Sequence, residues 1–246
     1  MWVVSSLVLG LRIAPVFTFA PPFTLVRLPL LFRVLFGLGL SACLVATLPR
    51  AAQLPDLALS TVVLAAMREL GLGLVVVLAF QLVFGALYFA GRTIDIQAGY
   101  GLALLIDPTS RAQTPLVGTL FAYAAGAVFF AFDGHIELLR LLAASLDAIP
   151  LAGWTMPDSI ARITAFMSIV FLTAFGVAGG SILALFLVDM AVAMLSRTVP
   201  QMNVLILGFQ VKTIVLLLVL STSFGIGGAL LLRMMTMTLR AIPGML

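Results

Sequence analysis

Few side chains in this sequence could perform chemistry, and those few do not form a catalytic set. There is one histidine, His135, and one cysteine, Cys43, among 246 residues. The sequence has no GxSxG nucleophile elbow, no HExxH zinc motif, no CxxC pair and no GxxxxGK[ST] phosphate loop. A lone cysteine excludes an intramolecular disulfide and is expected to be a small core residue. We therefore expect no catalytic residues, no enzymatic activity and no cofactor.

The stretch Asp133-Gly134-His135-Ile136-Glu137 brings three potential metal ligands together. Residues two apart on a helix point to different faces, so these side chains do not converge on one ion. An ordinary loop that leads into a helix, with Asp133 near the N-cap, explains the stretch better. We expect no metal site.

Lys212 is the only lysine and lies well inside an apolar run. An uncompensated amine at the centre of a membrane helix costs on the order of 3 kcal/mol. Pro200 and Gln201, followed by Asn203, mark the expected tip of a hairpin between the last two apolar helices. Asp189 lies 11 residues before Pro200 and Lys212 lies 12 after it, at matching depth. We expect a buried Asp189–Lys212 ion pair that fixes the hairpin register; a lysine arm that snorkels to the interface is the alternative.

The elements that must position these residues are membrane helices. The chain is 63% hydrophobic and only 9% charged, which is outside the range of soluble domains. A transmembrane helix needs about 20 mostly apolar residues. About six segments qualify, so we predict an all-α polytopic fold of apolar hairpins, with helices near 2–20, 28–48, 70–90, 116–132, 164–190 and 204–232.

Prolines should bend or interrupt the first hairpin, because proline lacks a backbone donor and clashes with the preceding turn. They lie at positions 15, 21, 22 and 29. The first segment has no positively charged start, so we expect a retained span and not a cleaved signal peptide.

Residues 135–147 predict an amphipathic connector between the fourth and fifth apolar segments, stopped by Pro150. Polar positions such as Glu137 and Arg140 follow helical spacing along one side and are spaced to pair. We expect the opposite face to dock on a neighbouring helix or subunit, because a connector offers it no other burial. That face is represented by Leu139, Leu142 and Leu146.

The charges carry little further information. The formal net charge of +4 comes from scattered single residues, with no basic cluster interleaved with aromatic side chains, so nucleic acid is not expected as a partner. The arginines divide almost evenly between alternate loops, so the positive-inside rule gives no orientation.

Four stretches, in matching order, resemble the FliR/SctT family of flagellar and type III secretion export-apparatus proteins. They are residues 12–21, AGRTIDIQAGYGLALLIDPTSRAQTP at 90–115, FDGHIELLRLLAASLDAIPLAG at 132–153, and SRTVPQMNVLILGFQVK at 196–212. Stretches 133–135 and 149–151 are closer to the flagellar branch. Gln210 departs from the family, which often has proline at this position and the helix kink that proline imposes.

The resemblance implies a structural subunit of an export gate in the bacterial inner membrane, at the flagellar basal body. It implies FliP-like, FliQ-like and FlhB-like partner subunits, unfolded export substrates and membrane lipid. Within one domain of residues 1–246, residues 1–155 would resemble a FliP subunit and residues 156–246 a FliQ hairpin. Residues 101–115 would be similar to the plug-like segment that helps close the channel, with gate residues Gly99, Gly101, Asp107, Pro108, Gln113 and Pro115.

Other classes of protein stay open. Interrupted helices and the ionisable Asp189 and Lys212 would also suit a small secondary transporter or channel, although no paired halves are visible. An intramembrane enzyme would need a nucleophile and base or a metal set, for which one histidine leaves little material. Within the family, an injectisome protein is the alternative to a flagellar one.

Overall fold

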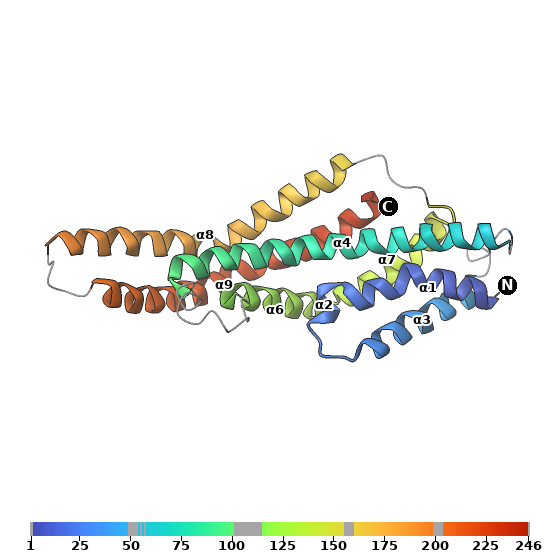
Figure 1. Cartoon of the computed structure of the whole chain (residues 1–246), viewed down its shortest axis with the longest axis horizontal. Coiled ribbons are helices and arrows are strands. Elements are labelled where there is room, and N and C mark those ends of the chain that lie inside the picture. Colours follow the sequence, from blue (N-terminus) through green and yellow to red (C-terminus); the bar gives the residue numbers. More distant parts are fainter. Residues whose placement is uncertain are drawn as a thin grey trace. The chain divides into compact units, whose positions relative to one another are not determined.

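The computed structural model describes residues 2–48, 54, 56, 58–100, 115–154, 160–198 and 204–245 (Figure 1). Every regular element within these ranges is a helix, which confirms the all-α prediction. The helices are α1 (Trp2–Phe19), α2 (Pro21–Thr24), α3 (Leu30–Thr47), α4 (Leu59–Ala98), α6 (Leu116–Ala131), α7 (Gly134–Ala148), α8 (Ile160–Thr198) and α9 (Val204–Met245).

Four helices are long and apolar enough to cross a membrane, namely α1, α3, α4 and α8. Two further stretches, α6 with α7 and the two parts of α9, pass the same test only as bent pairs, so the count is four to six. Helices α6 and α7 meet at an angle of 70°. Asp133 at this break has a left-handed backbone with φ 54°, a conformation that aspartate tolerates better than most residues. The polytopic prediction is therefore confirmed.

The long helices extend beyond the apolar segments seen in the sequence. Helix α4 has 40 residues, α8 has 39 and α9 has 42. At 1.5 Å per residue each is about 60 Å long, roughly twice the thickness of a bilayer core. Hydropathy locates only the apolar middle of α4, because charged residues such as Glu69 near its ends interrupt the pattern while the backbone continues as helix.

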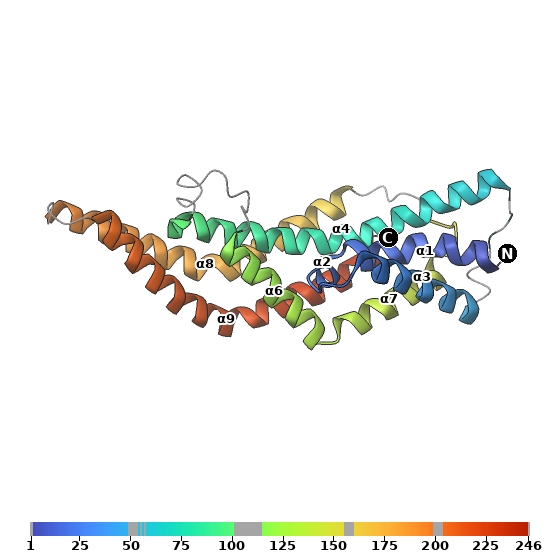
Figure 2. The same ribbon diagram turned by 60° about the horizontal axis from the view of Figure 1, so that its bottom comes forward.

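The first hairpin is interrupted at its turn and not within its first helix. Pro15 lies inside α1 without ending it. Pro21 and Pro22 instead open the four-residue α2, and Pro29 precedes α3. Helices α1 and α3 lie side by side in both views (Figures 1 and 2). Most of α3 stays uncovered, and Cys43 on it is exposed, so the expectation of a core cysteine is wrong.

The chain packs into two compact units. Unit 1 consists of Met1–Val83, Gly126–Ser168 and Met235–Leu246; unit 2 consists of Phe84–Ala125 and Ile169–Met234. The long helices α4, α6, α8 and α9 therefore contribute to both. The expected FliP-like and FliQ-like parts are defined by resemblance to other subunits and not by packing within this chain. The two packing units therefore do not test that division, which stays a proposal.

Each unit has its own packed interior. In unit 1, Phe80 and Phe129 stack edge to face at 5.6 Å between ring centroids, and both side chains are buried. In unit 2, α4 and α6 approach closely, because a Cβ atom at Gly91 would lie 2.3 Å from the Cα of Gly118. Only glycine fits such a crossing. The close packing places the polar side chains described next.

Candidate functional site

The most deeply buried charges belong to Arg12 on α1 and Glu69 on α4, whose side chains are both 0% exposed. Arg12 Nε donates to Glu69 Oε2 at 2.5 Å, and Arg12 Nη2 donates to Glu69 Oε1 at 3.0 Å. This two-point contact matches the planar guanidinium to the carboxylate. The pair lies entirely within unit 1.

Further hydrogen bonds complete what we call the N-terminal network: Arg12, Glu69, Ser145, Ile149 and Ala152. Arg12 Nη1 donates to Ser145 Oγ at 3.2 Å, and Nη2 donates to the Ile149 carbonyl at 3.0 Å. The Ala152 N–H donates to Glu69 Oε1 at 3.0 Å. The network thus ties α1 and α4 to α7 and to the turn after α7. A buried ion pair is tolerated only when its remaining polar atoms are also satisfied, and here they are.

Ala152 shows how strongly this turn is held. Its φ of 67° lies in the left-handed region, which is unfavourable for a residue with a Cβ atom. Glu69 accepts the Ala152 N–H, and Arg68 Nη1 donates to the Ala152 carbonyl at 2.7 Å. Two adjacent charged residues of α4 therefore fix both polar groups of one strained residue.

The sequence alone does not reveal this network. The available signal was Arg12 in the middle of an apolar segment and Glu69 at the edge of another, since a charge in a membrane segment needs a partner. The two residues are 57 positions apart, and no hairpin tip between them sets a register.

The second group, the hairpin network, consists of Asp189 on α8, Lys212 on α9 and Gln97 on α4, all in unit 2. Lys212 Nζ lies 2.5 Å from Asp189 Oδ1 and donates to the Gln97 carbonyl at 3.0 Å. Within unit 2, the C-terminal part of α8 and the N-terminal part of α9 run alongside each other in both views (Figures 1 and 2). A Cβ atom at Gly208 would lie 3.3 Å from Val192 Cγ1, which agrees with the same antiparallel register.

This pair is less buried than expected. The Lys212 side chain is 18% exposed, but that of Asp189 is 43% exposed, so the prediction of a buried pair is wrong for Asp189 in the chain by itself. The other described residues of this chain cover the Asp189 side chain only in part. The hairpin-tip residues Pro200, Gln201 and Asn203 lie outside the described residues.

Lys212 also makes a hydrogen bond to α4 that the hairpin register does not predict. Gln97 is in the last turn of α4, where carbonyl groups lack helical donors. A lysine that donates to such a carbonyl satisfies it and is favourably placed at the negative end of the helix. Gln97 Nε2 in turn donates to the Ile182 carbonyl at 3.1 Å. Lys212 therefore joins three helices, α4, α8 and α9.

Only the two ends of the expected gate loop are described. Gly99 has φ 89°, which favours glycine, and Phe209 Cδ2 lies 3.4 Å from where a Cβ atom would be. After the gap, Pro115 precedes α6, and the Val117 N–H donates to Asp95 Oδ1 at 3.1 Å. The remaining gate residues lie outside the described part of the chain: Gly101, Asp107, Pro108 and Gln113.

Helix α7 is the expected amphipathic connector. Leu142 and Leu146 are buried in unit 1, but Leu139 is only half-buried, and Leu138 takes the core position instead. The residues that pack inward within this chain are therefore Leu138, Leu142 and Leu146, and the docking of Leu139 on a neighbouring subunit stays a prediction. On the exposed side, Arg140 Nη1 donates to Glu137 Oε1 at 2.6 Å, as predicted.

Comparison with known proteins gives a consistent result. Residues 3–238 match the family described as "Bacterial export proteins, family 1". The chain is 27% identical to flagellar biosynthetic protein FliR of Bacillus subtilis, over 98% of this chain and 94% of that protein. It is 27% identical to FliR of Escherichia coli, over 58% of this chain and 56% of that protein. It is 30% identical to Yop proteins translocation protein T of Yersinia pestis, over 62% of this chain and 60% of that protein.

Proposed function

The chain belongs to the bacterial export proteins of family 1, and from this membership we propose that it is a structural subunit of a flagellar protein-export gate in the bacterial inner membrane. The observation that carries the proposal is the family match over residues 3–238, which includes both charge networks. The similarity to a flagellar FliR along 98% of this chain favours the flagellar apparatus.

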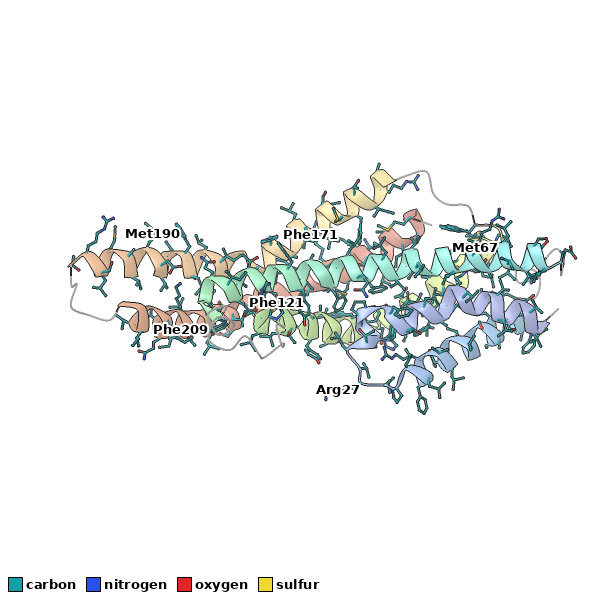
Figure 3. All side chains as sticks on the ribbon, viewed as in Figure 1. Arg27, Met67, Phe121, Phe171, Met190 and Phe209 are labelled. Atoms are coloured by element: carbon teal, nitrogen blue, oxygen red, sulfur yellow. The ribbon has the colours of Figure 1, made fainter. Side chains whose placement is uncertain are left out.

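We propose that the α8–α9 hairpin packs against helices of other subunits, in the manner of a FliQ hairpin. Many large apolar side chains on it are exposed, including Met190 on α8 and Phe209 on α9 (Figure 3). Asp189 lies beside Met190 and is 43% exposed. A carboxylate is expensive against hydrocarbon, so neighbouring protein or water explains this surface better than lipid does.

The partners proposed for this surface are FliP-like and FliQ-like subunits, with an FlhB-like subunit nearby. In this arrangement residues 1–155 occupy a FliP-like position and residues 156–246 a FliQ-like position. The subunits together form a channel for unfolded export substrates. The chain contributes helices, apolar surface and two charge networks to this channel and performs no reaction.

We further propose that residues 101–115 lie near the gate. The glycine conformation at Gly99 and the Asp95 hydrogen bond to the start of α6 support a loop whose two ends are held in unit 2. Deletion of residues 104–110 should make the resting gate leak ions while the complex still assembles. An equally tight gate, or a complex that no longer forms, would contradict the assignment.

Affinity purification of the tagged full-length chain in mild detergent tests the function directly. Recovery together with FliP-like and FliQ-like subunits is the expected result. A small transporter or channel would be recovered alone or as a homo-oligomer, and that result would refute the proposal. Lys212→Met serves as a variant that weakens the hairpin without touching unit 1.

An injectisome is the second candidate, because the chain is also 30% identical to a Yop translocation protein. Removal of the gene from its host separates the two. Loss of flagella and motility is expected for the flagellar gate. Normal motility with loss of effector secretion would assign the chain to an injectisome.

A further inference from the structure

A groove of about 570 Å³ lies in unit 1 between α7 and the C-terminal part of α9. Its apolar wall includes Leu141, Leu239 and Pro243, and its charged residues are Glu137, Arg140 and Arg240. This volume is within the range of about 300–1,000 Å³ that is typical of ligand pockets. The groove contains neither the Arg12–Glu69 pair nor the Asp189–Lys212 pair, and the proposed export function does not explain it.

The charges of the groove favour an anion. Arg140 is paired with Glu137, whereas Arg240 has no hydrogen bond or ion pair with any residue that the structure describes. A third arginine, Arg162, donates to the carbonyl of Gly244 at 2.7 Å, directly after Pro243 in the groove wall. The lining therefore carries a net positive charge, and one guanidinium is available to bind a ligand.

We propose that this groove binds an anionic phospholipid of the surrounding membrane. The phosphate would lie between Arg140 and Arg240, because a guanidinium donates two parallel hydrogen bonds to phosphate oxygens. The upper part of an acyl chain would lie along Leu141, Leu239 and Pro243. Basic pockets between membrane helices bind acidic headgroups in this way.

The occupied groove would also stabilise the N-terminal network. Ser145 and Ile149 line the groove, and both accept hydrogen bonds from Arg12. A bound lipid would pack against these two residues and hold α7 in place. Because a ligand that binds only the folded state raises its stability, anionic lipid should raise the melting temperature of the protein.

Native mass spectrometry of the full-length chain, purified in detergent both alone and with its partner subunits, tests the proposal. Detergent micelles are supplied with phosphatidylglycerol or, separately, with phosphatidylcholine. The wild type should retain phosphatidylglycerol preferentially. Arg240→Gln should weaken this retention roughly tenfold, as expected for the loss of one charge-assisted contact. Arg197→Gln, which changes an exposed arginine at the end of α8, is the matched control and should bind like the wild type.

Three results would overturn the proposal. The first is equal retention of the two lipids by the wild type. The second is an equal loss of phosphatidylglycerol from Arg240→Gln and Arg197→Gln. The third is lipid binding unaffected by Arg240→Gln together with poorer recovery of partner subunits, which would assign the groove to an acidic segment of a partner protein.

Discussion

Arg12 and Glu69 in unit 1 are fully enclosed by their own chain, whereas Asp189 in unit 2 keeps 43% of its side chain exposed beside Lys212. The first pair joins α1 and α4, which are distant in sequence, whereas the second pair joins the consecutive helices α8 and α9. The first pair is surrounded by hydrogen-bond partners, so nothing outside the chain is needed to complete it. The second pair leaves one side of Asp189 open on an apolar surface, which is an unfavourable arrangement unless another molecule covers it.

This difference indicates a division of roles between the two units. A self-contained pair stabilises the fold of the chain itself, and its strength should be the same with or without partners. A half-exposed pair gains strength when a partner excludes water, because electrostatic attraction rises as the effective dielectric constant falls. We therefore assign the N-terminal network to folding and the hairpin network to assembly.

The largest expected effect follows loss of one member of the buried pair. Glu69→Leu leaves the Arg12 guanidinium buried without a counter-charge and removes the acceptor of the Ala152 N–H. Breaking a buried pair in this way costs about 3–5 kcal/mol. We expect little folded protein in membranes and a much lower melting temperature in detergent.

The matched double variant Arg12→Met with Glu69→Leu sharpens this prediction. It removes both charges at similar volume, so it should be clearly more stable than either single variant. A single Glu69→Leu protein that melts like the wild type would show that the buried pair does not stabilise unit 1.

A smaller effect is expected where α1 and α4 cross. A Cβ atom at Gly73 would lie 2.5 Å from the backbone oxygen of Arg12. Gly73→Ala should push α1 away and distort the N-terminal network, at a cost of about 1–3 kcal/mol, which is typical of overpacking. Gly85→Ala on the same helix is the control, because a Cβ atom there meets nothing within 4 Å.

The melting temperatures of these two glycine variants check this prediction. Gly85→Ala should be neutral or slightly stabilising, since alanine favours helix. If Gly73→Ala were equally harmless, the close contact of α1 with α4 would not be needed to position Arg12.

The hairpin variants should affect the isolated chain unequally. Lys212→Met removes the partner of Asp189 and leaves the Gln97 carbonyl without its donor, which should cost about 1–2 kcal/mol. Asp189→Leu should cost less than about 1 kcal/mol, because the Asp189 side chain is partly hydrated and Lys212 still donates its hydrogen bond to the Gln97 carbonyl. Thermal melting of the two variants in detergent measures the order, and a larger loss for Asp189→Leu would contradict the geometry.

The smallest effect is expected at the exposed pair on α7. The side chains of Arg140 and Glu137 are 71% and 54% exposed, so Glu137→Gln should change the melting temperature by almost nothing. A marked destabilisation would mean that α7 depends on this surface pair. It would contradict the expectation that exposed pairs stabilise the fold much less than buried pairs do.

Sequence alone placed Asp189 opposite Lys212, because two neighbouring antiparallel helices have a defined register once the tip is located. It could not pair Arg12 with Glu69, since tertiary packing sets the register of helices that are not neighbours. It also could not predict that Leu138 is buried within the chain while Leu139 is half-buried, because leucines occupy both adjacent faces of α7 and only packing decides its rotation. The apolar pattern located the helices but missed the polar ends of α4.

Double-mutant cycles at both pairs, measured in the chain alone and in the complex with its partners, test the division of roles most directly. We expect strong coupling between Arg12 and Glu69 in both states. Coupling between Asp189 and Lys212 should be weak in the chain alone and clearly stronger in the complex. Coupling of Asp189 with Lys212 that is equally strong without partners would contradict the assignment of the hairpin network to assembly.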